Sequence, residues 1–132
     1  MKTVSSPLLY LMLMLGFVCG CGPCDDDADH LTSKESAKKR IASLCGVPAN
    51  DPSLDWVDEM LRQADGPTLR GKIYAFKYSG GVAITHQADV MSCLPCNVRD
   101  CSGAEIQLNN EISQELVSGM KSKNVIYNTS GL

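Results

Sequence analysis

Cysteine is the residue type in this chain whose spacing offers the most chemistry. Six cysteines follow residue 20, and three of them fall within nine residues: Cys93, Cys96 and Cys101. Thiols at this spacing can form disulfides, hold a soft metal ion or exchange electrons with other thiols. The compartment in which the chain folds decides among these chemistries, and the beginning of the sequence indicates that compartment.

The first twenty residues have the pattern of an export signal. Lys2 precedes an apolar run of a dozen residues from Pro7 to Val18. Such a run is typical of a secretory signal peptide, and it is shorter than the roughly 20 apolar residues that span a bilayer. We therefore predict a signal peptide over residues 1–20 and an exported mature chain.

The junction Val18-Cys19-Gly20-Cys21 resembles the lipobox of bacterial lipoproteins. The resemblance implies lipidation of Cys21, with palmitate among the attached chains, and attachment to the membrane through that lipid. The acidic residues behind it are similar to the export signal of Bacteroidota surface lipoproteins: Asp25, Asp26, Asp27 and Asp29. Ordinary signal peptidase would also accept Gly20, so secretion without an anchor is the alternative.

A second pair, Cys21-Gly22-Pro23-Cys24, has the letters of the thioredoxin redox motif. In that fold the motif follows a buried strand and opens a helix, which lowers the pKa of the first thiol. Here a signal peptide precedes it and aspartates follow it, and their negative charge disfavours a thiolate. We interpret the match as a coincidence at a processing site.

Removal of the signal leaves 112 residues, enough for one domain with one modest core. The loss of Lys2 takes the net charge from −3 to −4. The one basic cluster, Lys38-Lys39-Arg40, fits the solvated face of a helix, so a nucleic-acid partner is disfavoured. We predict an acidic flexible tether over residues 21–31 and a single domain over residues 32–132.

Two helices are predicted at the start of this domain. Thr32 and Glu35 form a capping-box pattern, and Gly46 with Pro48 marks the end of the first helix. Asp51 is the expected cap of the second helix, which stops at Gly66-Pro67. Its apolar stripe, including Trp56, is interpreted as core.

The remaining elements alternate between strand and helix patterns. Residues 72–78 and 82–86 alternate with period two around Gly80-Gly81, which predicts a hairpin with His86 in its second strand. We further expect a turn at Asp100–Gly103, a short helix after Asn110 and a strand over 125–127. The predicted fold class is α+β, a single domain with N-terminal helices packed on one face of a small antiparallel β-meander.

Disulfides are the favoured interpretation of the thiols in an exported chain. The candidates are Cys24, Cys45, Cys93, Cys96 and Cys101, an odd number if Cys21 carries lipid, and their connectivity stays open. A metal site would need a fourth ligand from Cys24, Cys45 or a histidine. Thiol exchange would need a partly exposed cysteine of low pKa. No metal ligand set, cofactor site or catalytic constellation emerges from the residues.

The helix that ends before Gly66-Pro67, the strand Ile73–Tyr78, the cysteine pair and the Asp100–Gly103 turn resemble a family of small Bacteroidota lipoproteins. These proteins carry a domain of unknown function. The resemblance covers about Leu54 to Ile106, and the chain lacks the family's Gly-rich, cysteine-containing C-terminal segment. It implies a location and a shape, and it adds no catalytic residue.

We therefore expect a lipid-anchored, non-enzymatic protein of the bacterial cell envelope. It would sit in the outer membrane, exposed at the surface, and bind an unknown protein or small-molecule ligand. The alternative is a secreted thiol-redox or metal-binding domain that uses Cys93, Cys96 and Cys101.

Overall fold

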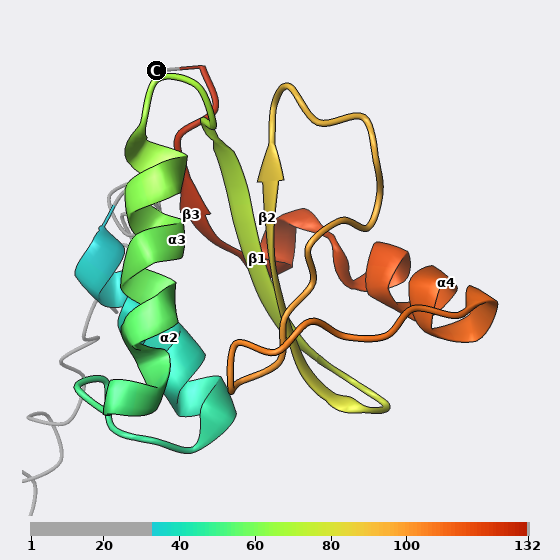
Figure 1. Cartoon of the computed structure of the whole chain (residues 1–132), viewed down its shortest axis with the longest axis horizontal. Helices are drawn as coiled ribbons and strands as arrows, with labels where there is room; N and C mark the ends of the chain where they lie inside the picture. The colour runs from blue at the N-terminus through green and yellow to red at the C-terminus, as the bar shows by residue number, and fades with distance from the viewer. Residues whose placement is uncertain (1–32, 132) are drawn as a thin grey trace, which may run out of the picture.

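The computed structural model describes residues 33–131, which form a single α+β domain (Figure 1). The elements in chain order are the helices α2 (Lys34–Cys45) and α3 (Asp55–Asp65), the strands β1 (Gly71–Tyr78) and β2 (Gly81–Ala88), the helix α4 (Asn110–Gly119) and the strand β3 (Val125–Asn128). None of the described helices has the length and apolar character needed to cross a membrane. The predicted signal peptide, the tether over 21–31, Cys21 and Cys24 lie outside the described residues.

Both N-terminal helices begin at polar caps. The hydroxyl of Ser33 accepts a hydrogen bond of 3.2 Å from the Ser36 backbone amide, so the cap of α2 is Ser33 and not the predicted Thr32. The Asp51 carboxylate accepts from the Ser53 amide at 2.9 Å. The turn that it caps, Pro52–Leu54, leads directly into α3. These short side chains bond amides that the helix itself leaves unpaired.

The hairpin of β1 and β2 confirms the period-two pattern. Tyr78 pairs with Gly81 across a two-residue turn, Ser79 and Gly80, one position earlier than the predicted Gly80-Gly81 turn. Gly81 has a φ angle of 131°, a backbone conformation that residues other than glycine rarely adopt. The turn therefore fixes the register that sorts the two faces of the sheet.

The strand order is β2-β1-β3, so the last strand pairs with the first. A simple meander would have placed β3 beside β2. The free edge of β2 is instead covered by the chain that follows it, because Ile84 and Arg99 exchange backbone hydrogen bonds of 2.9 and 2.8 Å. Only the far side of β1 is left to accept β3, which makes β1 the central strand.

Helices cover both faces of this sheet: the two N-terminal helices share one face, as the sequence predicted, and the later helix α4 covers the other. On one side α2 and α3 pack against Ile73 and Ile84. On the other side α4 packs its Leu116 against Phe76, and Figure 1 shows α4 across the sheet from α2 and α3. The cause is that β1 alternates apolar residues on both faces, and burying a large apolar side chain stabilises a fold by roughly 2 kcal/mol.

Two polar side chains near the C-terminus tie α3 to the sheet. The Thr129 hydroxyl donates to the Ala64 carbonyl at 2.6 Å and accepts from the Gly71 amide at 3.1 Å. The Tyr127 hydroxyl donates to Asp65 at 2.8 Å. Burial and this bond raise the pKa of Tyr127 to about 12. The end of α3, the start of β1 and β3 are thus held at one place.

Candidate functional site

The four cysteines of the described region form two disulfides. Cys45 at the end of α2 is joined to Cys101, with 5.7 Å between their Cα atoms. Cys93 is joined to Cys96 in the loop after β2, with 5.8 Å between the Cα atoms. Two disulfides in so small a domain are typical of proteins that fold in an oxidising, extracytoplasmic compartment.

This pairing separates the three thiols that lie together in the sequence. Cys101 is bonded to a residue 56 positions away, while Cys93 and Cys96 are bonded to each other. Within residues 33–131, no three His, Cys, Asp or Glu side chains gather closely enough to hold a metal ion. Any chemistry of the Cys93–Cys96 pair is therefore independent of Cys101.

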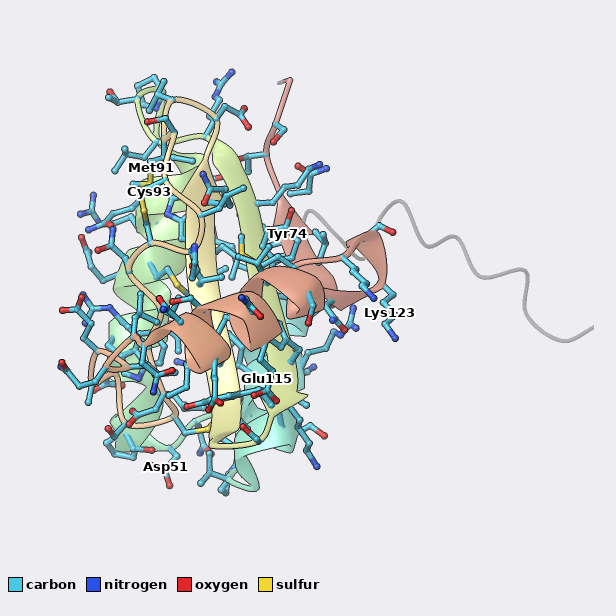
Figure 2. All side chains as sticks on the ribbon, turned by 90° about the vertical axis from the view of Figure 1, so that its right-hand side faces the viewer. Asp51, Tyr74, Met91, Cys93, Glu115 and Lys123 are labelled. Carbon is cyan, nitrogen blue, oxygen red and sulfur yellow. A yellow bond between two sulfur atoms is a disulfide. The ribbon has the colours of Figure 1, made fainter. Side chains whose placement is uncertain are left out.

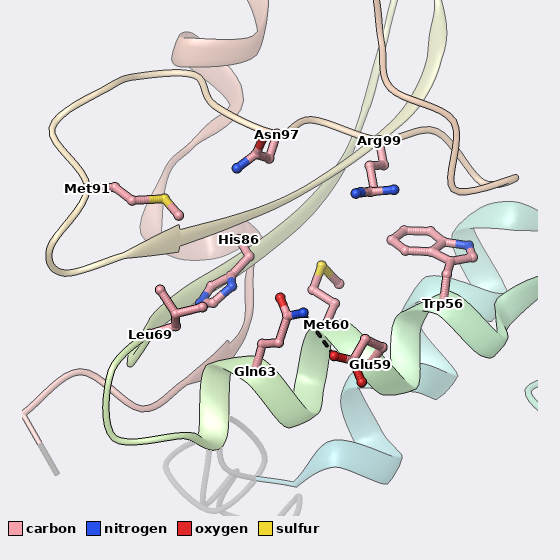
Figure 3. A pocket seen from close by; sticks show the side chains of 9 residues that line it. All are labelled: Trp56, Glu59, Met60, Gln63, Leu69, His86, Met91, Asn97 and Arg99. Carbon is pink, nitrogen blue, oxygen red and sulfur yellow. Dashed lines mark hydrogen bonds between the residues drawn. The ribbon is translucent and has the colours of Figure 1, made fainter.

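A cleft of about 390 Å³ lies between α3, the end of β2 and the chain that follows β2 (Figure 3). In Figure 3, Trp56 and Arg99 stand at one end and Leu69 and Met91 at the other. The complete lining is Trp56, Glu59, Met60, Gln63, Leu69, His86, Met91, Asn97 and Arg99. Clefts that combine apolar walls with a few polar groups are the usual form of a ligand site.

One face of α3 supplies the floor of this cleft. Trp56, Met60 and Gln63 recur at helical spacing and so lie along one side of the helix. The sequence interpretation placed Trp56 in the core. It packs against the main core and is half-buried, because its indole ring also lines the cleft beside Gly103.

The Asp100–Gly103 turn holds the wall above Trp56. The Asp100 carboxylate accepts hydrogen bonds from the amides of Ser102 at 2.8 Å and Ala104 at 3.1 Å, as the turn prediction required. Gly103 has φ of 83°, and a Cβ atom there would lie 2.8 Å from the Trp56 ring. The turn can therefore approach the indole only because residue 103 is glycine.

Within the part of the chain that the structure describes, His86 is one of two lining residues of the cleft with a buried polar atom that lacks a hydrogen-bond partner; the other is Trp56, through Nε1. His86 is 7% exposed, and its Nε2 has no hydrogen-bond partner among the described residues. It lies in β2, the second strand of the hairpin, as the sequence predicted. Burial lowers the pKa of His86 below 6.5, although the Leu69 backbone and the charge of Asp89 oppose this effect. The imidazole is thus neutral at pH 7.

The charged groups of the cleft differ in how far they are neutralised. Glu59 accepts hydrogen bonds from Arg62 at 2.8 Å and from Gln63 at 2.9 Å. These two bonds, that from Arg62 more than that from Gln63, lower the pKa of Glu59 to about 2. Arg99 donates from Nη1 to the Gly103 carbonyl at 2.9 Å. It joins none of the ion pairs between described residues. Arg99 is therefore the cation of the cleft whose charge is not balanced.

Sequence reasoning did not find this site, because its residues come from separate segments of the chain. Trp56 and Arg99 are far apart in sequence, and they meet through the pairing of Ile84 with Arg99 and the Cys45–Cys101 disulfide. No protein-family model, curated protein or solved structure matches this chain. Over residues 33–131 the structure itself establishes a small cysteine-containing domain, with three α-helices packed on a three-strand antiparallel sheet.

Proposed function

We propose that this protein is an exported, non-catalytic binding domain, held at the bacterial envelope by a lipid on Cys21, which binds its ligand in the cleft between α3 and β2. The two disulfides support folding outside the cytoplasm. The lipobox-like junction before Cys21 supports the anchor. The cleft supports the binding function.

The observation that carries the binding function is the unpaired Nε2 of His86. Buried polar atoms in folded proteins nearly always have a hydrogen-bond partner, and leaving one unpaired costs about 1–3 kcal/mol. His86 lines the cleft, so a polar group of a bound ligand can supply the missing partner. Ligand binding would then remove the free-energy penalty of the unpaired Nε2 atom in the ligand-free domain.

The rest of the cleft indicates the chemistry of that ligand. Trp56 and Met60 offer an aromatic and a flexible apolar surface. Arg99 offers an unbalanced positive charge at the same end as Trp56 (Figure 3). A planar apolar group joined to a carboxylate matches both features, since a carboxylate and a guanidinium form strong paired hydrogen bonds.

The composition of the lining favours binding over catalysis. None of the described residues that line the cleft carries a hydroxyl, thiol or amine nucleophile. Glu59, with a pKa of about 2, is a weak base at neutral pH. The cleft offers a shape, a positive charge, an imidazole and an indole N–H.

A titration tests the binding function. Indole-3-acetate serves as the charged probe and indole as its uncharged match, with binding followed by NMR shifts of the domain. We expect Arg99→Gln to weaken binding of indole-3-acetate by about tenfold and to leave indole unaffected. Arg40→Gln removes the same charge from the exposed surface of α2 and is the matched control. Equal affinities for both probes in all three proteins would contradict the proposed role of Arg99.

A mass measurement tests the anchor separately. The chain is expressed in a bacterium that processes lipoproteins, and its intact mass is compared with that of Cys21→Ser. A diacyl or triacyl increment that disappears in Cys21→Ser is the expected result. An unmodified mature chain that begins at Cys21 would rule out the anchor and leave simple secretion.

A further inference from the structure

We propose that the Cys93–Cys96 disulfide is a thiol-exchange site, which an external thiol opens through Cys93 while the Cys45–Cys101 disulfide stays closed. This role goes beyond ligand binding and does not depend on it. It rests on the exposure of the pair, the way its loop is held and the contrast with the second disulfide.

The pair lies on an exposed loop. Cys93 is exposed and Cys96 is half-buried. In Figure 2, Met91 and Cys93 lie together at the edge of the molecule, beside a disulfide drawn in yellow. The apolar side chains of Val90 and Leu94 are 74% and 59% exposed. An attacking thiol can therefore reach the sulfur of Cys93 without any movement of the core.

The loop stays anchored when the disulfide opens. At its start, the Met91 amide donates to the Ala88 carbonyl at 2.9 Å, and the Gln87 side chain donates to the Met91 carbonyl at 3.1 Å. At its end, the Thr85 hydroxyl donates to the Cys96 carbonyl at 2.8 Å. These bonds hold Cys96 to β2, whereas Cys93 lies between the two anchors. Reduction thus frees a short segment and leaves the domain folded.

The Cys45–Cys101 disulfide lies in different surroundings. Both of its cysteines are half-buried. Cys45, the last residue of α2, packs against the main core, and Cys101 lies within the hydrogen-bonded Asp100 turn. Partial burial of both cysteines and the hydrogen-bonded turn restrict the approach of an external thiol, and opening of the turn or of the end of α2 would remove that restriction. Exchange at this disulfide is therefore coupled to local unfolding.

Two external thiols supply the two electrons that reduce the Cys93–Cys96 disulfide. The first, as thiolate, attacks Sγ of Cys93; the bond to Sγ of Cys96 breaks, and Cys96 leaves as a thiolate that takes a proton from water. A second thiol then attacks the mixed disulfide, and Cys93 leaves as a thiol. Two electrons have passed to the protein pair, and the external thiols are left as a disulfide. The donor is either a small thiol or a protein dithiol.

A reduction time course on the exported chain tests this proposal. The oxidised protein is exposed to reduced glutathione, free thiols are alkylated at intervals, and mass spectrometry reports each cysteine separately, including Cys21 and Cys24. We expect Cys93 and Cys96 to become alkylated at least about tenfold faster than Cys45 and Cys101. Opening of both disulfides at one rate, or of Cys45–Cys101 first, would overturn the proposal.

Reduced thioredoxin in place of glutathione distinguishes the two kinds of donor. Faster opening per thiol by thioredoxin identifies a protein dithiol, and faster opening by glutathione identifies a small thiol. If neither donor opens Cys93–Cys96 ahead of Cys45–Cys101, the site is not an exchange site.

A pair of variants tests which sulfur is attacked. Cys96→Ala leaves the thiol of Cys93, and Cys93→Ala leaves the thiol of Cys96. With oxidised glutathione, we expect the first variant to form the mixed disulfide faster, because Cys93 is the exposed sulfur. Equal or reversed rates would contradict attack at Cys93. A cooperative thermal melting transition, at a similar temperature in the two variants, confirms that both are folded when they are compared.

Discussion

The two disulfides should contribute unequally to stability, because they close rings of different size. Cys45–Cys101 spans 56 residues of sequence and Cys93–Cys96 spans 3. From the entropy that a cross-link removes from the unfolded chain, the first contributes about 4 kcal/mol and the second about 2 kcal/mol. Replacing Cys45 and Cys101 together by alanine should therefore lower the free energy of unfolding by about 2 kcal/mol more than the same replacement at Cys93 and Cys96.

Guanidinium unfolding of the oxidised proteins measures this difference. The chain contains a single tryptophan, so the fluorescence of Trp56 reports the α3 region beside Cys101. The variant that lacks Cys93 and Cys96 is the matched control, since it also loses two cysteines and one disulfide. Equal stability of the two variants, or a larger loss of stability without Cys93–Cys96, would contradict the dependence on ring size.

Three further changes test other contacts. His86→Gln should flatten the pH dependence of stability. The pKa of His86 in the folded state is below 6.5, so the free energy of unfolding of the unmodified protein falls as the pH is lowered below 6.5. Similar curves for both proteins would contradict the buried neutral imidazole. Tyr127→Phe should lower the free energy of unfolding by about 1 kcal/mol in urea, through the lost bond to Asp65, and an unchanged midpoint would show that the bond contributes nothing. Gly119→Ala should cost about 1–3 kcal/mol in thermal unfolding, because its Cβ would collide with the ring of Phe76; a variant as stable as the parent would show that α4 does not pack there.

The sequence predicted those parts of the fold that depend on local patterns. The alternation around Ile73 and Tyr74, the cap at Asp51, the Asp100–Gly103 turn and the helix after Asn110 all appear in the structure. Each of them is set by residues within a few positions of one another, through periodicity, capping or turn geometry.

Strand order, disulfide connectivity and the cleft depend on distant contacts. The pairing of Ile84 with Arg99 decides which edge of the sheet accepts β3, and it also carries Arg99 to Trp56. No local sequence pattern predicts the pairing of Ile84 with Arg99. The apolar residues on both faces of β1 were the signal that could have predicted α4 on the second face.

The cleft around His86 is the proposed ligand site, and the imidazole itself can report on binding there. With the domain labelled by ¹⁵N, the two ring nitrogens of His86 are followed during a titration with indole-3-acetate. We predict that Nε2 shifts as it gains a hydrogen-bond partner, together with saturable shifts of the lining residues. Saturable binding that leaves His86 and Trp56 unshifted, or no binding at all, would contradict a ligand site at this cleft.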